Sequence, residues 1–290
     1  MLTPSPSPVA GLSALVGRYD AVICDVWGVL HNGVAAYAAA SDALVRLRET
    51  GVKVLLLTNA PRPSEPIHEQ LAALGVARAA YDDLLTSGDG TRAVLADRAE
   101  RRVAHIGPDR DLALYDGLSH LLVADDEAEI VVCTGLADDT RETPDDYRTR
   151  LAAFAARGLH LVCANPDIVV ERGTQKVWCA GAVARLYADE FGGAVTLVGK
   201  PHAPVYDEAR RRVAALVGRP VDDARILAIG DGLPTDIRGA HAQGFDVLFV
   251  TAGIHGADFG PLDAPDVRAV ERRLMEENLA VTTYLPRLTW

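Results

Sequence analysis

The 290-residue sequence lacks two features, long apolar segments and a surplus of basic residues. Its longest uninterrupted apolar stretch, Val34–Ala40, has about seven residues, whereas a helix that crosses a bilayer needs about 20. Its 29 lysine and arginine residues are outnumbered by 40 aspartate and glutamate residues, which gives a net charge of −11. Because nucleic acids and anionic membranes are bound through basic surfaces, we expect neither as a partner.

The sequence is also poor in cysteine. Four cysteines lie far apart and form no C-x-x-C pair, so no disulfide scaffold is indicated. Three of them stand inside apolar runs, which predicts buried thiols in a reducing compartment. The N-terminal residues MLTPSPSPVAG lack the positive and apolar regions of a signal peptide. We therefore expect a cytoplasmic protein with a short, frayed Pro/Ser-rich arm. The cysteines are Cys24, Cys133, Cys163 and Cys179.

Short apolar runs alternate with helical stretches along most of the chain. Most runs are continuously apolar, as expected for strands of a parallel sheet that is covered on both faces. Several helical stretches end just before a glycine, which is typical of helix C-termini. This rhythm predicts a doubly wound α/β fold, and the length suggests about two domains. The expected strands are Ala21–Cys24, Val54–Leu57, Val103–Ile106, Ile130–Cys133, Leu159–Cys163, Val195–Val198, Ile226–Ile229 and Val247–Val250. The expected helices are Ala38–Thr50, Ser64–Leu74, Asp145–Arg157 and Ala203–Val217.

Polar residues stand at the ends of several predicted strands, where open α/β sheets bind their ligands. Asp25 directly follows a buried strand, and an aspartate there costs stability unless it is paired or ligates a cation. Thr58 and Asn59 end another strand, where a hydroxyl and an amide are suited to phosphate oxygens. The alternatives are a capping aspartate and an ordinary turn.

Two further motifs complete the set. Lys200 follows a strand between a glycine and a proline, so it either neutralises an anion or is a surface lysine. It is not part of a Walker loop, because Pro201 stands where that motif needs serine or threonine. Asp231 and Asp236 are five residues apart across a Gly/Pro turn, a spacing that suits either a Mg²⁺ site or a capped turn.

Taken together and in this order, these elements resemble the four motifs of the haloacid dehalogenase superfamily. Asn165-Pro166-Asp167 and Phe249–Ile254 point further to its NagD-like class IIA branch. The resemblance implies a Rossmann-like core with an inserted class-two cap. About 140 residues separate Asn59 from Lys200, whereas one βαβ crossover needs only about 30. We therefore predict a core at 1–86 and 194–290 and an α/β cap at 87–193.

The resemblance implies a Mg²⁺-dependent phosphatase, a hydrolase of phosphoric monoesters. Asp25 would be the nucleophile that forms an aspartyl-phosphate. Mg²⁺ would contact the carboxylates of Asp25 and Asp231 and the main-chain oxygen of Trp27. Asp236 would orient metal-bound water.

The remaining residues implied by the resemblance bind the substrate, a small phosphorylated metabolite, with sugar phosphates as one class. Thr58 and the main chain of Asn59 would hold the transferring phosphoryl group, and Lys200 would neutralise its charge. The cap would set the substrate, with Asn165-Pro166-Asp167 facing it, and Asn165 is the candidate for binding it. By analogy with the family, a homodimer would form through the cap.

One position departs from the family pattern. Its phosphatases normally carry a second aspartate two residues after the nucleophile, and here that residue is Trp27. The indole N–H only donates a hydrogen bond, so general acid–base catalysis, typically worth about 10²–10⁴-fold, is missing. Either the leaving group needs little protonation, or His31 replaces the acid, or the protein is a catalytically weak or silent phosphometabolite-binding protein. Trp27 would stack on a substrate or pack against the protein.

Within the expected cap, His105 stands in an apolar run and is predicted to be a satisfied core residue. Asp138–Asp146 is predicted to be a polar loop and helix start. The sequence does not separate substrate-binding arginines from solvated ones among Arg92, Arg101, Arg102, Arg110 and Arg141.

Overall fold

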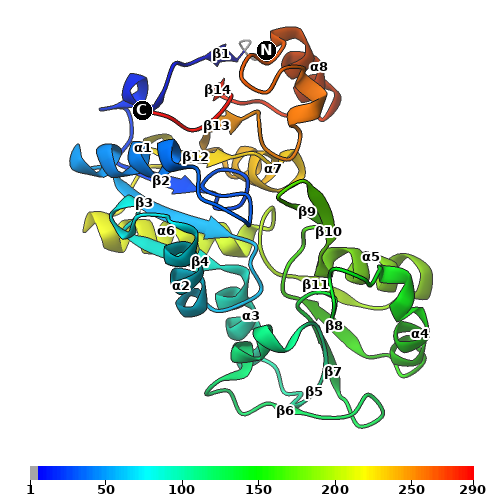
Figure 1. The fold of residues 1–290 in the computed structure, drawn as a ribbon. Helices are drawn as coiled ribbons and strands as arrows, with labels where there is room; N and C mark the ends of the chain where they lie inside the picture. Colours follow the sequence, from blue (N-terminus) through cyan, green and yellow to red (C-terminus); the bar gives the residue numbers. More distant parts are fainter. Residues whose placement is uncertain (1–5) are drawn as a thin grey trace. The chain divides into compact units, whose positions relative to one another are not determined.

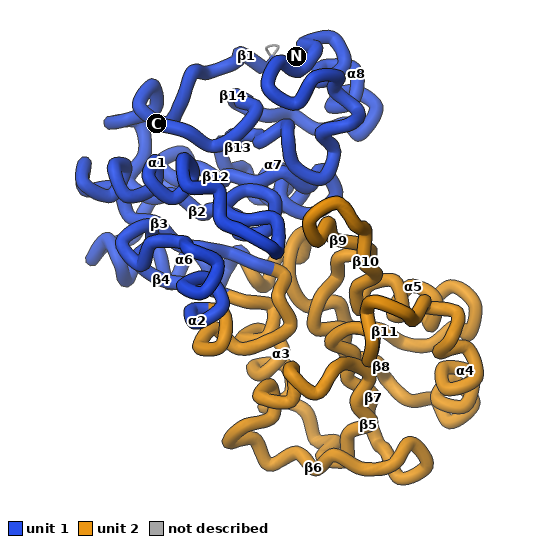
Figure 2. Tube along the Cα trace, in the orientation of Figure 1, with its two compact units in different colours: residues 1–58, 68–85, 206–290 blue, residues 59–67, 86–205 orange. Residues whose placement is uncertain are grey.

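The computed structural model describes residues 6–290, which divide into two compact units (Figure 2). Unit 1 comprises Met1–Thr58, His68–Leu85 and Tyr206–Trp290. Unit 2 comprises Asn59–Ile67 and Thr86–Val205. The predicted limits of a cap at 87–193 stay a prediction.

Unit 1 is built on a seven-stranded sheet with the strand order β1-β14-β13-β12-β2-β3-β4 (Figure 1). The central strands β2 and β12 pair in parallel, with Cys24 opposite Ile229. Every residue of these two strands is buried, as expected for a parallel sheet covered on both faces. The strands are β1 (Ser7–Pro8), β2 (Ala21–Cys24), β3 (Lys53–Thr58), β4 (Asp83–Thr86), β12 (Ile226–Gly230), β13 (Asp246–Val250) and β14 (Thr283–Leu285).

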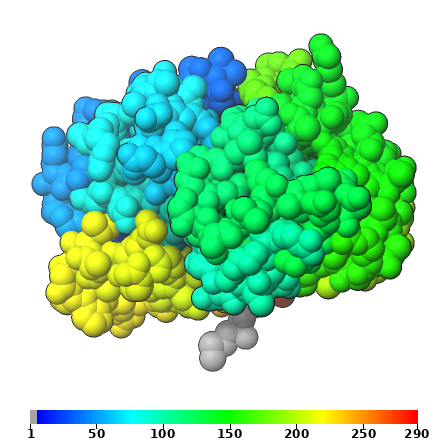
Figure 3. Space-filling view, turned by 90° about the horizontal axis from the view of Figure 1, so that it is seen from below, coloured from blue at the N-terminus to red at the C-terminus, as the bar shows by residue number. Residues whose placement is uncertain are grey.

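Helices surround this sheet (Figure 1). Helices α1 (Ala38–Glu49), α7 (Arg238–Gln243) and α8 (Val267–Glu276) lie within unit 1, whereas α2 (Ser64–Leu74) and α6 (Ala203–Val217) begin in unit 2 and end in unit 1. The yellow surface in Figure 3 belongs to α6 and the segment that follows it. A π-helix at Leu233–Ile237 precedes α7. Short 3₁₀ turns occupy Leu12–Leu15, Arg78–Ala80, Asp223–Arg225 and Gly256–Phe259.

Unit 2 has its own five-stranded parallel sheet, with the order β11-β8-β7-β5-β6. Side chains of β7 alternate between two apolar clusters, because Val131 and Cys133 join one and Ile130 and Val132 join the other. This sheet is therefore also buried on both faces. Its strands are β5 (Arg102–Ile106), β6 (Leu121–Leu122), β7 (Ile130–Cys133), β8 (His160–Cys163) and β11 (Val195–Leu197). Its helices are α3 (Ser87–Ala96), α4 (Arg148–Ala156) and α5 (Ala180–Phe191), with 3₁₀ turns at Asp109–Tyr115 and Pro144–Tyr147.

An antiparallel hairpin completes unit 2, with β9 (Val169–Arg172) paired to β10 (Gln175–Trp178). No apolar run in the sequence indicates this hairpin. Its turn contains Gly173 with a positive φ of 65°, a conformation that favours glycine. Its strands are mostly half-buried or exposed, so they lack the apolar runs by which the other strands were found.

The predicted fold class is confirmed: a parallel-sheet α/β core is accompanied by a smaller α/β unit inserted into its sequence. All eight predicted strands are present, with ends that differ by at most a residue. The predicted frayed arm is wrong for Ser7–Pro8, which pair with β14; residues 1–5 lie outside the described part. Among the described helices, none is long and apolar enough to cross a membrane.

The prediction of buried thiols is confirmed for all four cysteines, none of which forms a disulfide. Burial raises the pKa of Cys133 to about 12 and also raises the pKa values of Cys163 and Cys179. These thiols are therefore protonated at neutral pH and unreactive.

Asp82, just before β4, forms an ion pair and hydrogen bonds that stabilise unit 1. Its carboxylate accepts hydrogen bonds from Arg48 at 2.6 and 3.0 Å and from the main chain of Val54 at 2.8 Å. Burial alone would raise the pKa of Asp82, but the hydrogen bonds from Arg48 and Val54 outweigh it, so the pKa is lowered.

We expect Asp82→Asn to lower the free energy of unfolding by about 1.5–3 kcal/mol at pH 7, because it removes charged hydrogen bonds in a half-buried site. Because the pKa of Asp82 is lower in the folded protein than in the unfolded chain, its ionised carboxylate stabilises the folded protein at pH values above the unfolded pKa of about 3.9. This contribution to the free energy of unfolding is lost as the pH falls through the folded pKa of Asp82. Urea unfolding at pH 7 and at pH 3 measures this, and the difference between the two proteins should shrink at pH 3. Asp42→Asn, at an exposed i,i+4 pair with Arg46, should be nearly neutral; a deficit for Asp82→Asn that is unchanged at pH 3 would contradict the electrostatic explanation.

Candidate active site

Three carboxylates meet where β2 and β12 end. Asp25 follows β2, and Asp231 and Asp236 follow β12. All three are buried, and each offers an oxygen atom within 4.8 Å of the others. The main-chain N–H of Asp25 donates to the oxygen of Ile229 at 2.8 Å, which fixes the two strand ends against each other. Parallel pairing thus brings together residues that are some 200 positions apart in the chain.

Glycines leave the space that Asp231 occupies. A Cβ atom at Gly28 or at Gly253 would lie 2.1 or 2.0 Å from its Oδ2 atom. That same oxygen accepts a hydrogen bond from the main-chain N–H of Ile254 at 2.8 Å. Gly28 has a positive φ of 83°, so both its conformation and its position require glycine. The carboxylate of Asp231 is therefore held in one place by main chain on both sides.

Asp236 is held in a similar way. It lies in the π-helix at Leu233–Ile237, and its Oδ2 atom accepts from the main-chain N–H of Gly232 at 3.1 Å. A Cβ atom at Gly230 would lie 2.2 Å from the Cβ of Asp236. The segment that carries Asp236 is thus a π-turn that leads into α7.

The three buried carboxylates repel one another unless a cation is present. An all-oxygen donor set of carboxylates suits a hard divalent cation such as Mg²⁺. The residues present therefore fit the predicted metal, with Asp25, Asp231 and Asp236 as its candidate ligands or water-orienting groups.

Thr58 is the last residue of β3, the neighbour of β2 on the side away from β12. Cys24 pairs with Leu56, so Thr58 and Asp25 leave the same edge of the sheet on adjacent strands. Thr58 is buried. The structure thus brings this predicted phosphate ligand to the carboxyl edge that carries the three aspartates.

The other predicted site residues lie together in unit 2. The side-chain amide of Asn59 accepts from the main-chain N–H of Lys200 at 2.8 Å and donates to the main-chain oxygen of Lys200 at 3.1 Å. It also donates to Asp167 at 2.9 Å. The side-chain amide of Asn59 is thus engaged with protein groups, and a role for its main chain in binding a phosphate stays a prediction. Lys200 is buried.

In the motif Asn165-Pro166-Asp167, the two polar side chains have different contacts. The side-chain oxygen of Asn165 accepts the main-chain N–H of Asp167 at 3.0 Å. Asn165 therefore orients Asp167, which reaches Asn59. A role for Asn165 in facing a substrate stays a prediction.

His31 is buried, with only 2% of its surface exposed, so it is not a solvated loop histidine. Its ring packs edge-on against Trp27 with 5.0 Å between centroids. Its Nδ1 atom accepts from the main-chain N–H of Gly33 at 2.9 Å, which assigns the proton of the neutral ring to Nε2. Burial lowers the pKa of His31 to about 4. Near neutral pH, His31 therefore has neither an acidic proton nor a vacant basic nitrogen.

The arginines of unit 2 that the sequence left open all contact protein groups. Arg92 donates to the main-chain oxygens of Leu114 and Asp116 at 2.8 and 2.7 Å. Arg101 donates to the main-chain oxygen of Arg98. The other three form ion pairs, Arg102 with Glu129, Arg110 with Asp139, and Arg141 with Asp138.

Two further predictions for unit 2 can be compared with the structure. His105 contacts the hydroxyl of Tyr115 at 2.9 Å, but its buried Nε2 atom has no hydrogen-bond partner, so the prediction of a satisfied histidine is only half right. The polar segment Asp138–Asp146 does end in a helix start, where Thr143 and Asp146 form a capping box.

Comparisons with known proteins identify the family of this chain. A family model described as haloacid dehalogenase-like hydrolase matches residues 22–118, and a second, HAD-hydrolase-like model matches residues 197–270. A crystal structure of a haloacid dehalogenase-like hydrolase from Brucella suis 1330 has 46% sequence identity and a TM-score of 0.86, and the match covers 96% of this chain and 99% of that one. The chain belongs to the haloacid dehalogenase-like family.

Within the family, the NagD-like branch is supported by curated relatives. The ribonucleotide monophosphatase NagD of Escherichia coli K12 is 24% identical over 241 residues, which is 82% of this chain and 89% of that protein. The D-glycerol 3-phosphate phosphatase of Mycobacterium tuberculosis is 26% identical over 252 residues, 85% of this chain and 67% of that protein. The resemblance predicted from the motifs is thus confirmed at the level of family and branch.

We expect Gly253→Ala to lower the affinity for Mg²⁺ by about 10–100-fold, because the new Cβ displaces Asp231 and outer-shell changes typically cost that much. Isothermal titration with Mg²⁺ measures it. Gly135→Ala is the matched control, since the nearest atom to its Cβ lies 3.8 Å away. Equal Mg²⁺ affinity in Gly253→Ala and the wild type would show that Asp231 does not bind the metal.

Proposed function

We propose that this hydrolase is a Mg²⁺-dependent phosphatase of small phosphorylated metabolites in which Asp25 is the nucleophile. The observation that carries the proposal is the buried cluster of Asp25, Asp231 and Asp236 at the carboxyl edge of the core sheet. The named activities of the two curated relatives, on a nucleotide and on glycerol 3-phosphate, support phosphoric monoesters as the substrate class.

The metal would be held by Asp25, Asp231 and the main-chain oxygen of Trp27, with Asp236 orienting its water. When bound, Mg²⁺ lowers the repulsion between the carboxylate and the phosphate and stabilises charge in the transition state. The fixed position of Asp231 between Gly28 and Gly253 keeps this donor set preorganised.

In the first step, a carboxylate oxygen of Asp25 forms a bond to phosphorus while the bond from phosphorus to the leaving oxygen breaks. The leaving oxygen takes the electron pair of that bond. In the second step, the oxygen of a water molecule attacks the same phosphorus and the bond to Asp25 breaks, which releases inorganic phosphate and restores the carboxylate. Positioning and charge neutralisation account for most of the rate in such transfers.

Thr58 and the main chain of Asn59 would hold the transferring phosphoryl group, and Lys200 would neutralise its charge. The two hydrogen bonds between Asn59 and the main chain of Lys200 support this pairing of roles, because they fix the lysine to the residue that follows Thr58. The choice of metabolite would depend on unit 2. A homodimer through that unit stays a prediction.

Trp27 favours substrates whose leaving groups need little protonation. Neither its indole nor His31 can supply a proton near neutral pH, since burial holds the pKa of His31 at about 4. Acyl phosphates and other anhydrides have such leaving groups, so we propose that this protein hydrolyses them faster than it hydrolyses alkyl phosphate monoesters.

The alternative is a catalytically weak or silent protein that binds a phosphorylated metabolite. Trp27 and His31 favour it, because their rings pack edge-on against each other, and the position where the resemblance places an acid is thus filled by a packed indole that does not ionise. The two functions differ in turnover, and the two variants below separate them.

We expect Asp25→Asn to lower Mg²⁺-dependent phosphate release by roughly 10³-fold or more, because the amide is a far weaker nucleophile than the carboxylate. EDTA should abolish the wild-type activity, and added Mg²⁺ should restore it. Release of phosphate from a panel of acyl phosphates, sugar phosphates and nucleotides is the measurement, with Asp42→Asn on the exposed face of α1 as control. Unchanged release in Asp25→Asn excludes Asp25 as the nucleophile, and no wild-type release from any substrate favours the silent alternative.

We expect Trp27→Asp to raise kcat on alkyl phosphates by about 10²–10⁴-fold, since it supplies the absent general acid. The gain should be small on acyl phosphates, whose leaving groups do not need the proton. Trp27→Asn is the matched control, because asparagine has nearly the same size as aspartate but no acidic group, and this variant should show no gain in kcat. If Trp27→Asp and Trp27→Asn behave alike, the loss of the acid does not limit this enzyme.

A further inference from the structure

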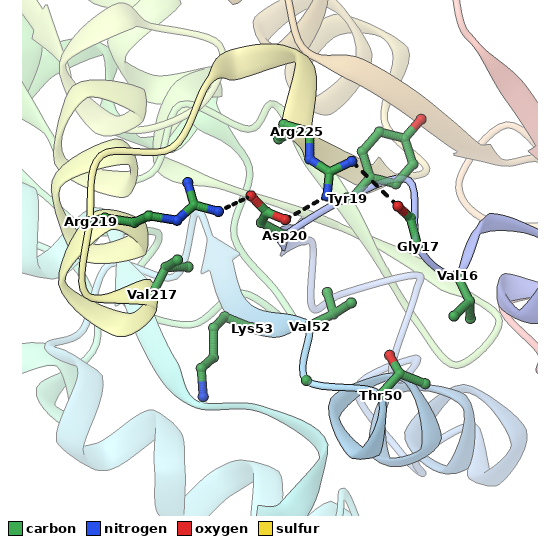
Figure 4. A pocket seen from close by; sticks show the side chains of 11 residues that line it. Val16, Gly17, Tyr19, Asp20, Thr50, Val52, Lys53, Val217, Arg219 and Arg225 are labelled. Carbon is green, nitrogen blue, oxygen red and sulfur yellow. Dashed lines mark hydrogen bonds and ion pairs between the residues drawn. The ribbon is translucent and has the colours of Figure 1, made fainter.

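A second pocket lies in unit 1, away from the three aspartates, with a volume of about 370 Å³ (Figure 4). It is formed where β2, β3 and β12 begin, because Asp20 precedes β2, Lys53 opens β3 and Arg225 precedes β12. The proposed phosphatase uses the opposite ends of the same strands. Its size lies within the range of small-molecule sites, about 300–1,000 Å³.

The lining of this pocket has an excess of positive charge. Lys53, Arg219 and Arg225 line it together with a single carboxylate, Asp20. Figure 4 shows Asp20 between the two guanidinium groups, which donate to its two oxygens at 2.6 Å each. One carboxylate cannot neutralise three cations, so the lining has a net charge of about +2. This contrasts with the net charge of −11 of the whole chain.

Neighbouring groups do not remove this excess. Lys53 approaches Asp82 only to 4.0 Å, and both oxygens of Asp82 already accept hydrogen bonds from Arg48. The remaining contacts of the two pocket arginines are to main-chain oxygens, those of Gly17 and Pro220. Both arginines are about half exposed, so an entering ligand can reach them.

Apolar side chains complete the lining, namely Val16, Val52 and Val217. A short hydrocarbon skeleton could pack against them while its anionic groups contact the cations. We propose that this pocket binds a small dianion with phosphate or carboxylate groups, at a site separate from that of the proposed phosphatase reaction.

The separation of the two sites follows from the strands. About five residues at about 3.3 Å each lie between the pocket end and the aspartate end of β2, which gives roughly 15–20 Å. A small dianion in the pocket therefore cannot touch Asp25 or compete directly with a substrate there. The proposal does not depend on which reaction the aspartates catalyse.

Amide chemical shifts of the ¹⁵N-labelled full chain can test the proposal, because they report the two sites separately. We expect a titration with inorganic phosphate to shift the amides of Gly17, Gly51 and Val52 in a saturable way. Gly28, which contacts Asp231, reports binding at the aspartates. Titration with succinate at matched ionic strength shows whether carboxylates or phosphates are preferred, and sodium chloride controls for salt.

Arg219→Ala and Lys53→Ala should weaken binding at these pocket amides by at least about tenfold, since each removes a charged donor. Arg46→Ala, which removes an exposed arginine of α1, should leave it unchanged. Arg219→Gln keeps the aliphatic part of the side chain but not its charge, so it controls for loss of packing. Pocket amides that do not shift with phosphate or succinate, that shift equally with chloride, or that saturate equally in Arg219→Ala and the wild type would overturn the proposal.

Discussion

The mutual repulsion of three buried carboxylates is the constraint on which the site depends. Asp25, Asp231 and Asp236 are brought together by the parallel pairing of β2 with β12. Asp231 and Asp236 also lie against glycines, where an added Cβ atom would displace them. Such an arrangement is costly unless a cation and main-chain donors offset it. Two main-chain N–H groups, those of Ile254 and Gly232, donate hydrogen bonds to Asp231 and Asp236. Together with the glycines and the π-turn, they position and stabilise the negative charge of these carboxylates.

The sequence was sufficient for the elements whose signal is local. Continuously apolar runs located the buried strands, and polar residues at their ends located Asp25, Thr58 and Asp231. The hairpin β9–β10 was missed because its half-exposed strands lack such runs. The link from Asn59 to Asp167 was missed because a hydrogen bond between residues 108 positions apart leaves no local pattern. Burial of His31 is likewise a result of tertiary packing.

Trp27 and His31 lie in the loop after β2, whose main chain is held by several contacts. The loop after β2 keeps Gly28 at positive φ beside Asp231, and the main-chain N–H of Gly28 donates to the oxygen of His31 at 2.8 Å. The two rings then pack against each other above this turn. The turn that carries Trp27 is thus held both by a main-chain hydrogen bond and by the packing of the Trp27 and His31 rings.

The hydrogen bonds of Asn59 to the main chain of Lys200 have a consequence for how the protein can change over time. They join the first and the last part of unit 2, which are about 140 residues apart in the chain. Because hydrogen bonds link the two ends of the insertion, its length and sequence can vary without displacing the strands of the core. New substrate preferences could therefore arise in unit 2 while the sheet that carries the aspartates keeps its register.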